Sequence, residues 1–187
     1  TGFQFHRGCL AVGVRPQATT LDDAIAAATM VVVLERVVDP DNVGAVFRCA
    51  EAFGADAVLV SPGCCDPYYR KAIRTSSGAA LVVPFAQADP WPDALQHLRA
   101  KGFHIVATTP DSGATEIGAF VQRSDAHGKV AVLFGTEGHG LTAEALDRAD
   151  IRLSIPMTGA IDSLNIGTLA GIVLHRLHEV RTAAQGT

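Results

Sequence analysis

The sequence of 187 residues suits one compact domain, and 48% hydrophobic against 18% charged residues excludes an intrinsically disordered chain. The longest apolar runs, such as residues 130–134, are far shorter than a membrane span, so we expect no transmembrane helix and no signal-peptide core. The formal net charge of −4 argues against a dedicated nucleic-acid clamp, since such domains are usually basic and any strong attraction to phosphate must then be local.

Short β-rich runs alternate with helical patterns along the chain. In chain order, the periodicity predicts strand 10–14, helix 21–28, strand 31–36, helix 43–53, strand 57–60, helix 68–75, strand 81–83, helix 92–101, strands 103–107 and 130–134, helix 142–148, strand 151–155 and helix 164–181. Apolar strands that alternate with helices favour an α/β domain, with a mostly parallel sheet and helices on both faces. Residues 110–125 form the least regular internal segment.

Three loops each follow a predicted strand and lead into a predicted helix: residues 39–44, 135–141 and 156–165. In parallel sheets ligands bind at the carboxyl ends of the strands. We therefore expect the functional residues in these three loops.

The first loop leads into the predicted helix 43–53, for which Asn42 is a good N-cap. Gly44 and Arg48 lie one turn apart on a single face of that helix. The glycine leaves room for another group to approach the helix closely, and the arginine one turn away can extend across the surface at that point. The alternative is a solvated Arg48 that pairs with Glu51.

The second loop has three glycines, Gly135, Gly138 and Gly140, directly after an apolar strand. Glycines allow a backbone to approach a ligand closely. The order of the glycines differs from that of a dinucleotide-binding fingerprint, and no Gly-Lys-Ser/Thr follows as in a P-loop. Glu137 inside the loop suits a ligand with hydroxyl, amino or cationic groups better than a pyrophosphate. The alternative is a plain glycine-rich turn.

The third loop precedes a long amphipathic helix, which Ser163 or Asp162 can cap. Its apolar residues recur at the spacing of a core-facing helix, but that pattern does not explain the polar Asn165 beside them. Gly167 and Gly171 lie four residues apart, where a second element can pack tightly.

The four cysteines are Cys9, Cys49, Cys64 and Cys65. They form no C-x-x-C pair and no zinc pattern with nearby histidines. We interpret them as free thiols of a reducing cytoplasm.

Together the loops resemble the three signature motifs of the SpoU (TrmH-like) branch of the SPOUT methyltransferases. The first motif covers residues 42–55, the second 133–141, and the third 155–157, 163–165 and 170–171. Order and spacing match over roughly residues 30–180. One such motif is weak, but three in order are highly specific and favour the functional interpretation of each loop.

The resemblance implies an α/β domain whose carboxyl-terminal part threads a deep trefoil knot, in a homodimer with active sites at the subunit interface. Gly167 and Gly171 would suit that close packing. It also implies that residues 1–20 lead from an RNA-recruiting domain into the catalytic domain, residues 21–187. The implied activity is transfer of a methyl group from S-adenosylmethionine to a ribose 2′-hydroxyl of ribosomal or transfer RNA, in the cytoplasm and without a metal ion.

The resemblance also assigns the site residues. Those that hold S-adenosylmethionine are Gly135, Ile155, Met157 and Leu164, and the catalytic set is Arg48, Asn42, Glu137, Ser163 and Asn165. Family analogy places Arg48 beside the 2′-oxygen. A role as a base is difficult for a guanidinium, because this group stays protonated at ordinary pH, so we favour orientation and oxyanion stabilisation.

Two rival functions stand beside methyl transfer. A non-catalytic RNA-binding protein would keep the fold and lose the chemistry, which the intact polar set disfavours. A dinucleotide-dependent oxidoreductase is weaker, because the glycine fingerprint is lacking.

Overall fold

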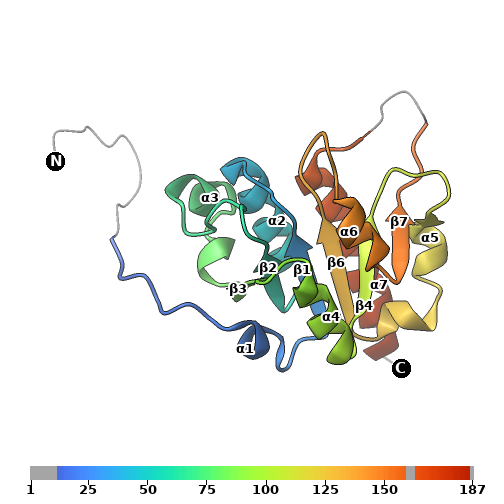
Figure 1. The fold of residues 1–187 in the computed structure, drawn as a ribbon, viewed down its shortest axis with the longest axis horizontal. Coiled ribbons are helices and arrows are strands. Elements are labelled where there is room, and N and C mark those ends of the chain that lie inside the picture. Colours follow the sequence, from blue (N-terminus) through green and yellow to red (C-terminus); the bar gives the residue numbers. More distant parts are fainter. Residues whose placement is uncertain (1–11, 159–162, 186–187) are drawn as a thin grey trace.

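The structure, a computed structural model, describes residues 12–158 and 163–185 (Figure 1). Within these residues, seven strands form one sheet in the order β3-β2-β1-β6-β4-β7-β5, and all neighbours run parallel. The strands are β1 (Met30–Leu34), β2 (Ala57–Val60), β3 (Phe85–Gln87), β4 (His104–Thr108), β5 (Thr115–Glu116), β6 (Val130–Phe134) and β7 (Ile151–Ser154). The predicted α/β class with a mostly parallel sheet is confirmed.

Helices connect the strands and cover both faces of the sheet (Figure 1). The α-helices are α1 (Leu21–Ile25), α2 (Pro40–Ala52), α3 (Arg70–Thr75), α4 (Asp93–Ala100), α5 (Ile117–Phe120), α6 (Ala143–Asp147) and α7 (Ile166–Gln185), and two 3-10 helices are η1 (Ala79–Leu81) and η2 (Ser124–His127). Among the described residues, no helix combines the length and apolar character needed to cross a membrane.

The central strands β1 and β6 are buried along their whole length. Because successive side chains of a strand point to opposite faces, β1 contributes to two hydrophobic cores. Val32 and Leu34 join the core beneath α2, α3 and α7. Val31 and Val33 join the core beneath α1, α4 and α6. The sheet is therefore a layer between two sets of helices, and its strand ends are available for a site.

Three predicted elements are wrong. Of strand 10–14, residues 10 and 11 lie outside the described part, and residues 12–14 form no strand. Predicted strand 81–83 is replaced by η1, where i→i+3 bonds such as Leu81 N–H to Gly78 O (2.9 Å) close a tight turn, and β3 begins four residues later than predicted. The segment predicted to be irregular contains β5, α5 and the start of η2.

The chain leaves β1 and β6 in opposite directions. After β1 it passes through α2 to β2 and then β3, away from β6. After β6 it passes through α6 to β7, on the far side of β4. The helices α2 and α6 pack on opposite faces. Such a topological switch point leaves a crevice at the carboxyl ends of the strands, where ligands bind in open α/β sheets.

Candidate active site

A cavity of about 620 Å³, here named the cofactor cavity, opens at the carboxyl ends of β4, β6 and β7. Its volume lies within the range of about 300–1,000 Å³ that is usual for small-ligand sites. Residues 108–110, 135–140 and 163–166 line it, although they are far apart in the sequence. The lining includes seven of the nine predicted site residues: Gly135, Glu137, Ile155, Met157, Ser163, Leu164 and Asn165.

The glycine-rich loop after β6 folds tightly onto itself. A Cβ at Gly135 would collide with the backbone of Gly140 and Leu141, so no other residue fits there without a shift. Gly138 and Gly140 have φ values of +84° and +67°, in the left-handed region that favours glycine. The loop closes with the N–H of Gly140 donating to the Thr136 carbonyl at 2.9 Å. Its glycines therefore bring backbone and the Glu137 side chain to the cavity.

Three predicted catalytic residues form one hydrogen-bonded cluster. The amide nitrogen of Asn165 donates to Asn42 Oδ1 at 3.1 Å and to Glu137 Oε1 at 2.8 Å. The Asn165 Oδ1 accepts from the backbone N–H of Gly167 at 2.9 Å. Asn165 thus uses both ends of its side chain, and three distant motifs meet at this one residue.

The caps of the two helices differ from those predicted. Asp39, and not Asn42, caps α2, accepting from the Asp41 N–H at 2.9 Å. Asn42 lies inside the helix and is 7% exposed, with its side chain directed to Asn165. At α7 the cap is Asn165, through the bonds to Gly167 and Thr168, rather than Ser163. The other predicted cap, Asp162, lies outside the described residues.

Close packing explains two glycines that sequence alone left ambiguous. A Cβ at Gly44 would lie 2.6 Å from the Ala72 carbonyl oxygen of α3, so the group that approaches this glycine is a neighbouring helix. A Cβ at Gly167 would lie 2.7 Å from Ala45 Cβ, which is too close, whereas one at Gly171 would lie 3.6 Å from Cys49 Sγ, an ordinary van der Waals contact. Both glycines of α7 therefore face α2 of the same chain, which corrects their assignment to a subunit interface.

Asp41 fastens the first turn of α2 to α3. Its carboxylate pairs with Lys71 Nζ at 2.8 Å and accepts from Thr75 Oγ1 at 2.9 Å. These bonds, the one from Lys71 first, hold the pKa of Asp41 below its usual value. The start of α2 is thereby fixed in place, together with Asn42.

Arg48 does not line the cofactor cavity. It is exposed on α2, and within residues 12–158 and 163–185 its guanidinium has neither a hydrogen-bond nor an ion-pair partner. The pairing with Glu51 considered above is therefore not formed. The structure brings Asn42, Glu137 and Asn165 together but leaves Arg48 apart from them.

Several cavity residues were not predicted from sequence. Thr108, Thr109 and Pro110 end β4, and His139 lies in the glycine-rich loop. The signal for residues 108–110 was present, because a predicted strand ends there beside β6 and β7. Sequence reasoning had considered only loops that lead directly into helices.

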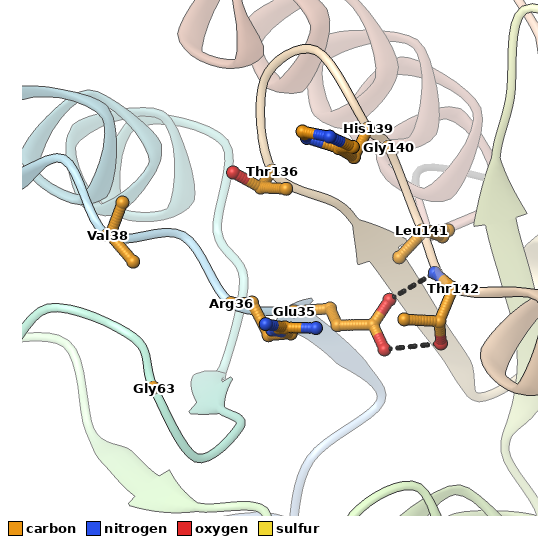
Figure 2. A pocket seen from close by; sticks show the side chains of 9 residues that line it. All are labelled: Glu35, Arg36, Val38, Gly63, Thr136, His139, Gly140, Leu141 and Thr142. Carbon is orange, nitrogen blue, oxygen red and sulfur yellow. Dashed lines mark hydrogen bonds between the residues drawn. The ribbon is translucent and has the colours of Figure 1, made fainter.

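Glu35 was also missed, because the predicted strand 31–36 included it, whereas β1 ends at Leu34. Glu35 is 1% exposed. Its Oε1 accepts from Trp91 Nε1 at 2.6 Å. Two further bonds come from Thr142, whose Oγ1 donates to Oε1 at 2.7 Å and whose backbone N–H donates to Oε2 at 2.8 Å (Figure 2). Because three donors satisfy its charge, Glu35 ties the end of the glycine-rich loop to β1.

The cysteines offer no reactive thiol or metal centre in the described part of the chain. Cys49, Cys64 and Cys65 are free, and burial raises the pKa of each of these thiols. Cys9 lies outside the described residues. No group of three His, Cys, Asp or Glu side chains suited to a metal ion occurs within residues 12–158 and 163–185.

Comparison with known proteins connects this geometry to a family. The model of the SpoU rRNA Methylase family matches residues 29–175, which include all nine predicted site residues. The chain belongs to this family. Its three motifs are thus family motifs, and one residue of each, Asn42, Glu137 and Asn165, belongs to the hydrogen-bonded cluster.

Named relatives agree with this membership. An uncharacterized tRNA/rRNA methyltransferase of Mycobacterium tuberculosis is 41% identical over 93% of this chain and 60% of its own. A 23S rRNA (guanosine-2′-O-)-methyltransferase of Vibrio vulnificus is 32% identical over 96% of this chain and 73% of its own. The chain spans about 60% of the length of the mycobacterial relatives.

Solved structures share the fold. The SpoU methyltransferase AviRb of Streptomyces viridochromogenes, in complex with the cofactor AdoMet, superposes with a TM-score of 0.76 at 28% identity, over 89% of this chain and 66% of its own. An AdoMet-bound rRNA methyltransferase of Sinorhizobium meliloti gives 0.78 at 30% identity, over 87% of this chain and 61% of its own.

Proposed function

We propose that this chain transfers a methyl group from S-adenosylmethionine to a ribose 2′-hydroxyl of ribosomal or transfer RNA. The observation that carries the proposal is the Asn42–Asn165–Glu137 cluster at a cavity that Gly135, Ile155 and Leu164 line. Family membership and the AdoMet-bound relatives support the same activity. We also propose that the protein acts in the cytoplasm, where such RNAs are used.

The chemistry of the cofactor cavity fits S-adenosylmethionine. Backbone groups at Gly135, Ile155 and Leu164 are available to hold its polar edges, and Met157, 38% exposed, offers an apolar surface for the adenine. The Glu137 carboxylate is complementary to a cationic ligand, and the sulfonium carries a positive charge. When bound, this cofactor supplies the electrophilic methyl group.

The polar cluster positions the acceptor ribose. Asn165 is held at both ends, by Asn42 and Glu137 on one side and by the α7 backbone on the other. Such a preorganised group orients a hydroxyl at little entropic cost. Ser163 is exposed at the same cavity, so its hydroxyl is free to contact a substrate.

Arg48 orients the ribose and stabilises the charge that develops on its 2′-oxygen. A guanidinium remains protonated at all ordinary pH values, so it does not act as the base. The proton of the 2′-hydroxyl leaves to water or to an RNA phosphate. Loss of one such stabilising donor typically lowers turnover by about 100- to 1,000-fold.

A homodimer would complete this site. Arg48 is exposed on α2 and does not line the cofactor cavity of its own chain, so we propose that a second copy brings its Arg48 to the cavity. Mixing an Arg48→Ala variant with a Glu137→Ala variant tests this directly. Mixed dimers should recover part of the activity that each variant lacks, whereas a monomer by light scattering would contradict the arrangement.

We also propose that the chain after β7 threads a trefoil knot. The convergence of residues 108–110, 135–140 and 163–166 on one cavity supports it, because a knot would bring these three segments together. The boundary at residue 20 between a leading segment and the catalytic domain stays a prediction.

The test of the activity is tritiated methyl transfer from S-adenosylmethionine to ribosomal and transfer RNA at low salt, where weak phosphate contacts are least screened. The modified position should then resist alkaline cleavage, since a methylated 2′-oxygen no longer attacks the neighbouring phosphate. Binding of the cofactor without transfer to any of these RNAs would favour the non-catalytic alternative. Absence of cofactor binding would contradict the proposal altogether.

A further inference from the structure

A second cavity, of about 530 Å³, lies against the same glycine-rich loop (Figure 2). Glu35, Arg36 and Val38 after β1, Gly63 after β2, and residues of the loop line it. It therefore occupies the switch point between β1 and β6, where the fold leaves a crevice for a ligand. None of the nine predicted site residues lines it.

We propose that this second cavity binds a nucleotide of the substrate RNA, with the base against Val38 and His139 and the phosphate at Arg36. The inference rests on the proposed function, because it assigns to that reaction the place where its RNA is held. Its volume lies within the usual range of small-ligand sites, about 300–1,000 Å³.

The second cavity and the cofactor cavity share a wall. Thr136, His139 and Gly140 line both. A nucleotide in the second cavity therefore lies beside the loop that carries Glu137 to the cofactor cavity. This adjacency suits an RNA strand that places a ribose at the cofactor cavity while one of its bases is held in the second cavity.

Hydrogen bonds hold the floor of the second cavity in a fixed position. Glu35 accepts three hydrogen bonds from Trp91 and Thr142, so its oxygens are occupied and its position is fixed. It does not need a ligand to satisfy its charge. The groups left to meet a ligand are the side chains of Arg36, Val38, Thr136 and His139.

Arg36 is held in an unfavourable backbone conformation. Its φ is +53°, in the left-handed region that costs a non-glycine residue free energy, and its N–H donates to Ser61 Oγ at 3.0 Å. In the described part of the chain its guanidinium has no partner. A strained, exposed and unpaired arginine at a cavity is a natural phosphate contact.

The remaining surfaces suit a base. Val38 is 66% exposed, which is unusual for valine, and it lies across the cavity from Thr136 and His139 in Figure 2. The exposed imidazole of His139 can stack on a base, and such stacking accepts any of the four bases. An aliphatic group on one side and an imidazole on the other match the two faces of a planar ring.

Trp91 provides a direct probe, since it is the only tryptophan of the chain and its indole N–H donates to Glu35 in the cavity floor. The experiment records the single indole N–H resonance of the full chain saturated with S-adenosylhomocysteine. Each of the four nucleoside 5′-monophosphates is then added at millimolar concentration, with ribose 5-phosphate and inorganic phosphate as probes that lack a base. We expect the nucleotides to shift the resonance, and the two base-free probes to shift it much less.

Two variants separate the side chain of Arg36 from its backbone strain. Arg36→Gly removes both, whereas Ser77→Gly relieves a similar positive φ of +55° away from both cavities. Both should raise the melting temperature slightly, by about 2 °C. Only Arg36→Gly should weaken nucleotide binding, by about tenfold, the loss expected for one charge-assisted contact.

The outcomes distinguish this inference from the proposed function. If no nucleotide shifts the resonance while methyl transfer proceeds, the second cavity does not bind RNA, and the proposed methyltransferase activity is kept. If nucleotides displace S-adenosylhomocysteine, they bind in the cofactor cavity and the inference is overturned. If nucleotides bind but neither the cofactor nor methyl transfer is detected, the proposed function fails and the nucleotide site remains.

Discussion

Glu35 and Asn42 belong to a part of the site that is buried, whereas Glu137, Ser163 and Met157 belong to a part that is exposed. The buried part, Glu35 together with residues 42–44, contains satisfied polar groups and a helix contact close enough to require glycine at position 44. The exposed part, residues 135–140, 155–158 and 163–165, consists of loops whose polar groups face a cavity. The first part therefore fixes geometry, and the second is left to meet ligands.

The largest effect on activity should come from Arg48, which belongs to neither part. Both Arg48→Ala and Arg48→Lys should lower methyl transfer by about 100- to 1,000-fold, because an ammonium lacks the planar fork of a guanidinium. Since Arg48 is exposed and unpaired in the described chain, the free energy of unfolding should change by less than about 0.5 kcal/mol. Thermal unfolding and tritiated methyl transfer measure the two quantities. If Arg48→Lys retains more than a tenth of the activity, Arg48 contributes only its positive charge to the contact with RNA.

In the buried part, Gly44→Ala should cost about 1–3 kcal/mol of stability, because its Cβ would collide with α3. Gly118→Ala is the matched control, as a Cβ there meets nothing within 4 Å and alanine favours a helix by up to about 1 kcal/mol. Chemical denaturation of both variants gives the comparison. Equal stabilities would mean that α2 and α3 adjust freely, and that the buried part does not fix geometry.

Glu35→Gln tests the tie between the buried part and the glycine-rich loop. The amide NH₂ group of the glutamine would face the N–H and O–H donors of Trp91 and Thr142, which it cannot satisfy. We therefore expect the free energy of unfolding to fall by about 1–3 kcal/mol. Trp91→Phe removes one of these donors, and the double variant should lose less than the sum of the two single losses. Additive losses in denaturant melts would show that the two groups are not coupled.

The smallest effects should separate the two roles of Asn165. Asn165→Ala removes the α7 cap and should cost about 1 kcal/mol. Asn165→Asp keeps an acceptor for Gly167, but it loses the donor to Asn42 and Glu137 and places two carboxylates against each other. It should therefore lose methyl transfer and also some stability, although the helix cap is kept. An Asp variant that keeps full activity would show that the bonds to Asn42 and Glu137 do not matter.

The sequence predicted the α/β class, most strands and the loops of the site, because buried parallel strands leave clear apolar runs. It did not predict which residue caps each helix, since Asp39 and Asn42 are both good caps and the choice depends on Asn165, 123 positions away. Nor did the sequence distinguish glycines that are needed for contacts between helices of one chain from glycines that are available for contact with a second subunit. Gly167 faces α2 because of tertiary packing, which local pattern does not contain.

The central claim is that the cavity of the exposed part is built for S-adenosylmethionine. Titration calorimetry of the 187-residue chain with S-adenosylmethionine and with NAD tests it most directly. We expect micromolar binding of S-adenosylmethionine and none of NAD. The affinity for S-adenosylmethionine should be unchanged in Arg48→Ala, because Arg48 does not line the cavity of its own chain and is assigned to the ribose of the RNA. Binding of NAD without binding of S-adenosylmethionine would contradict the account.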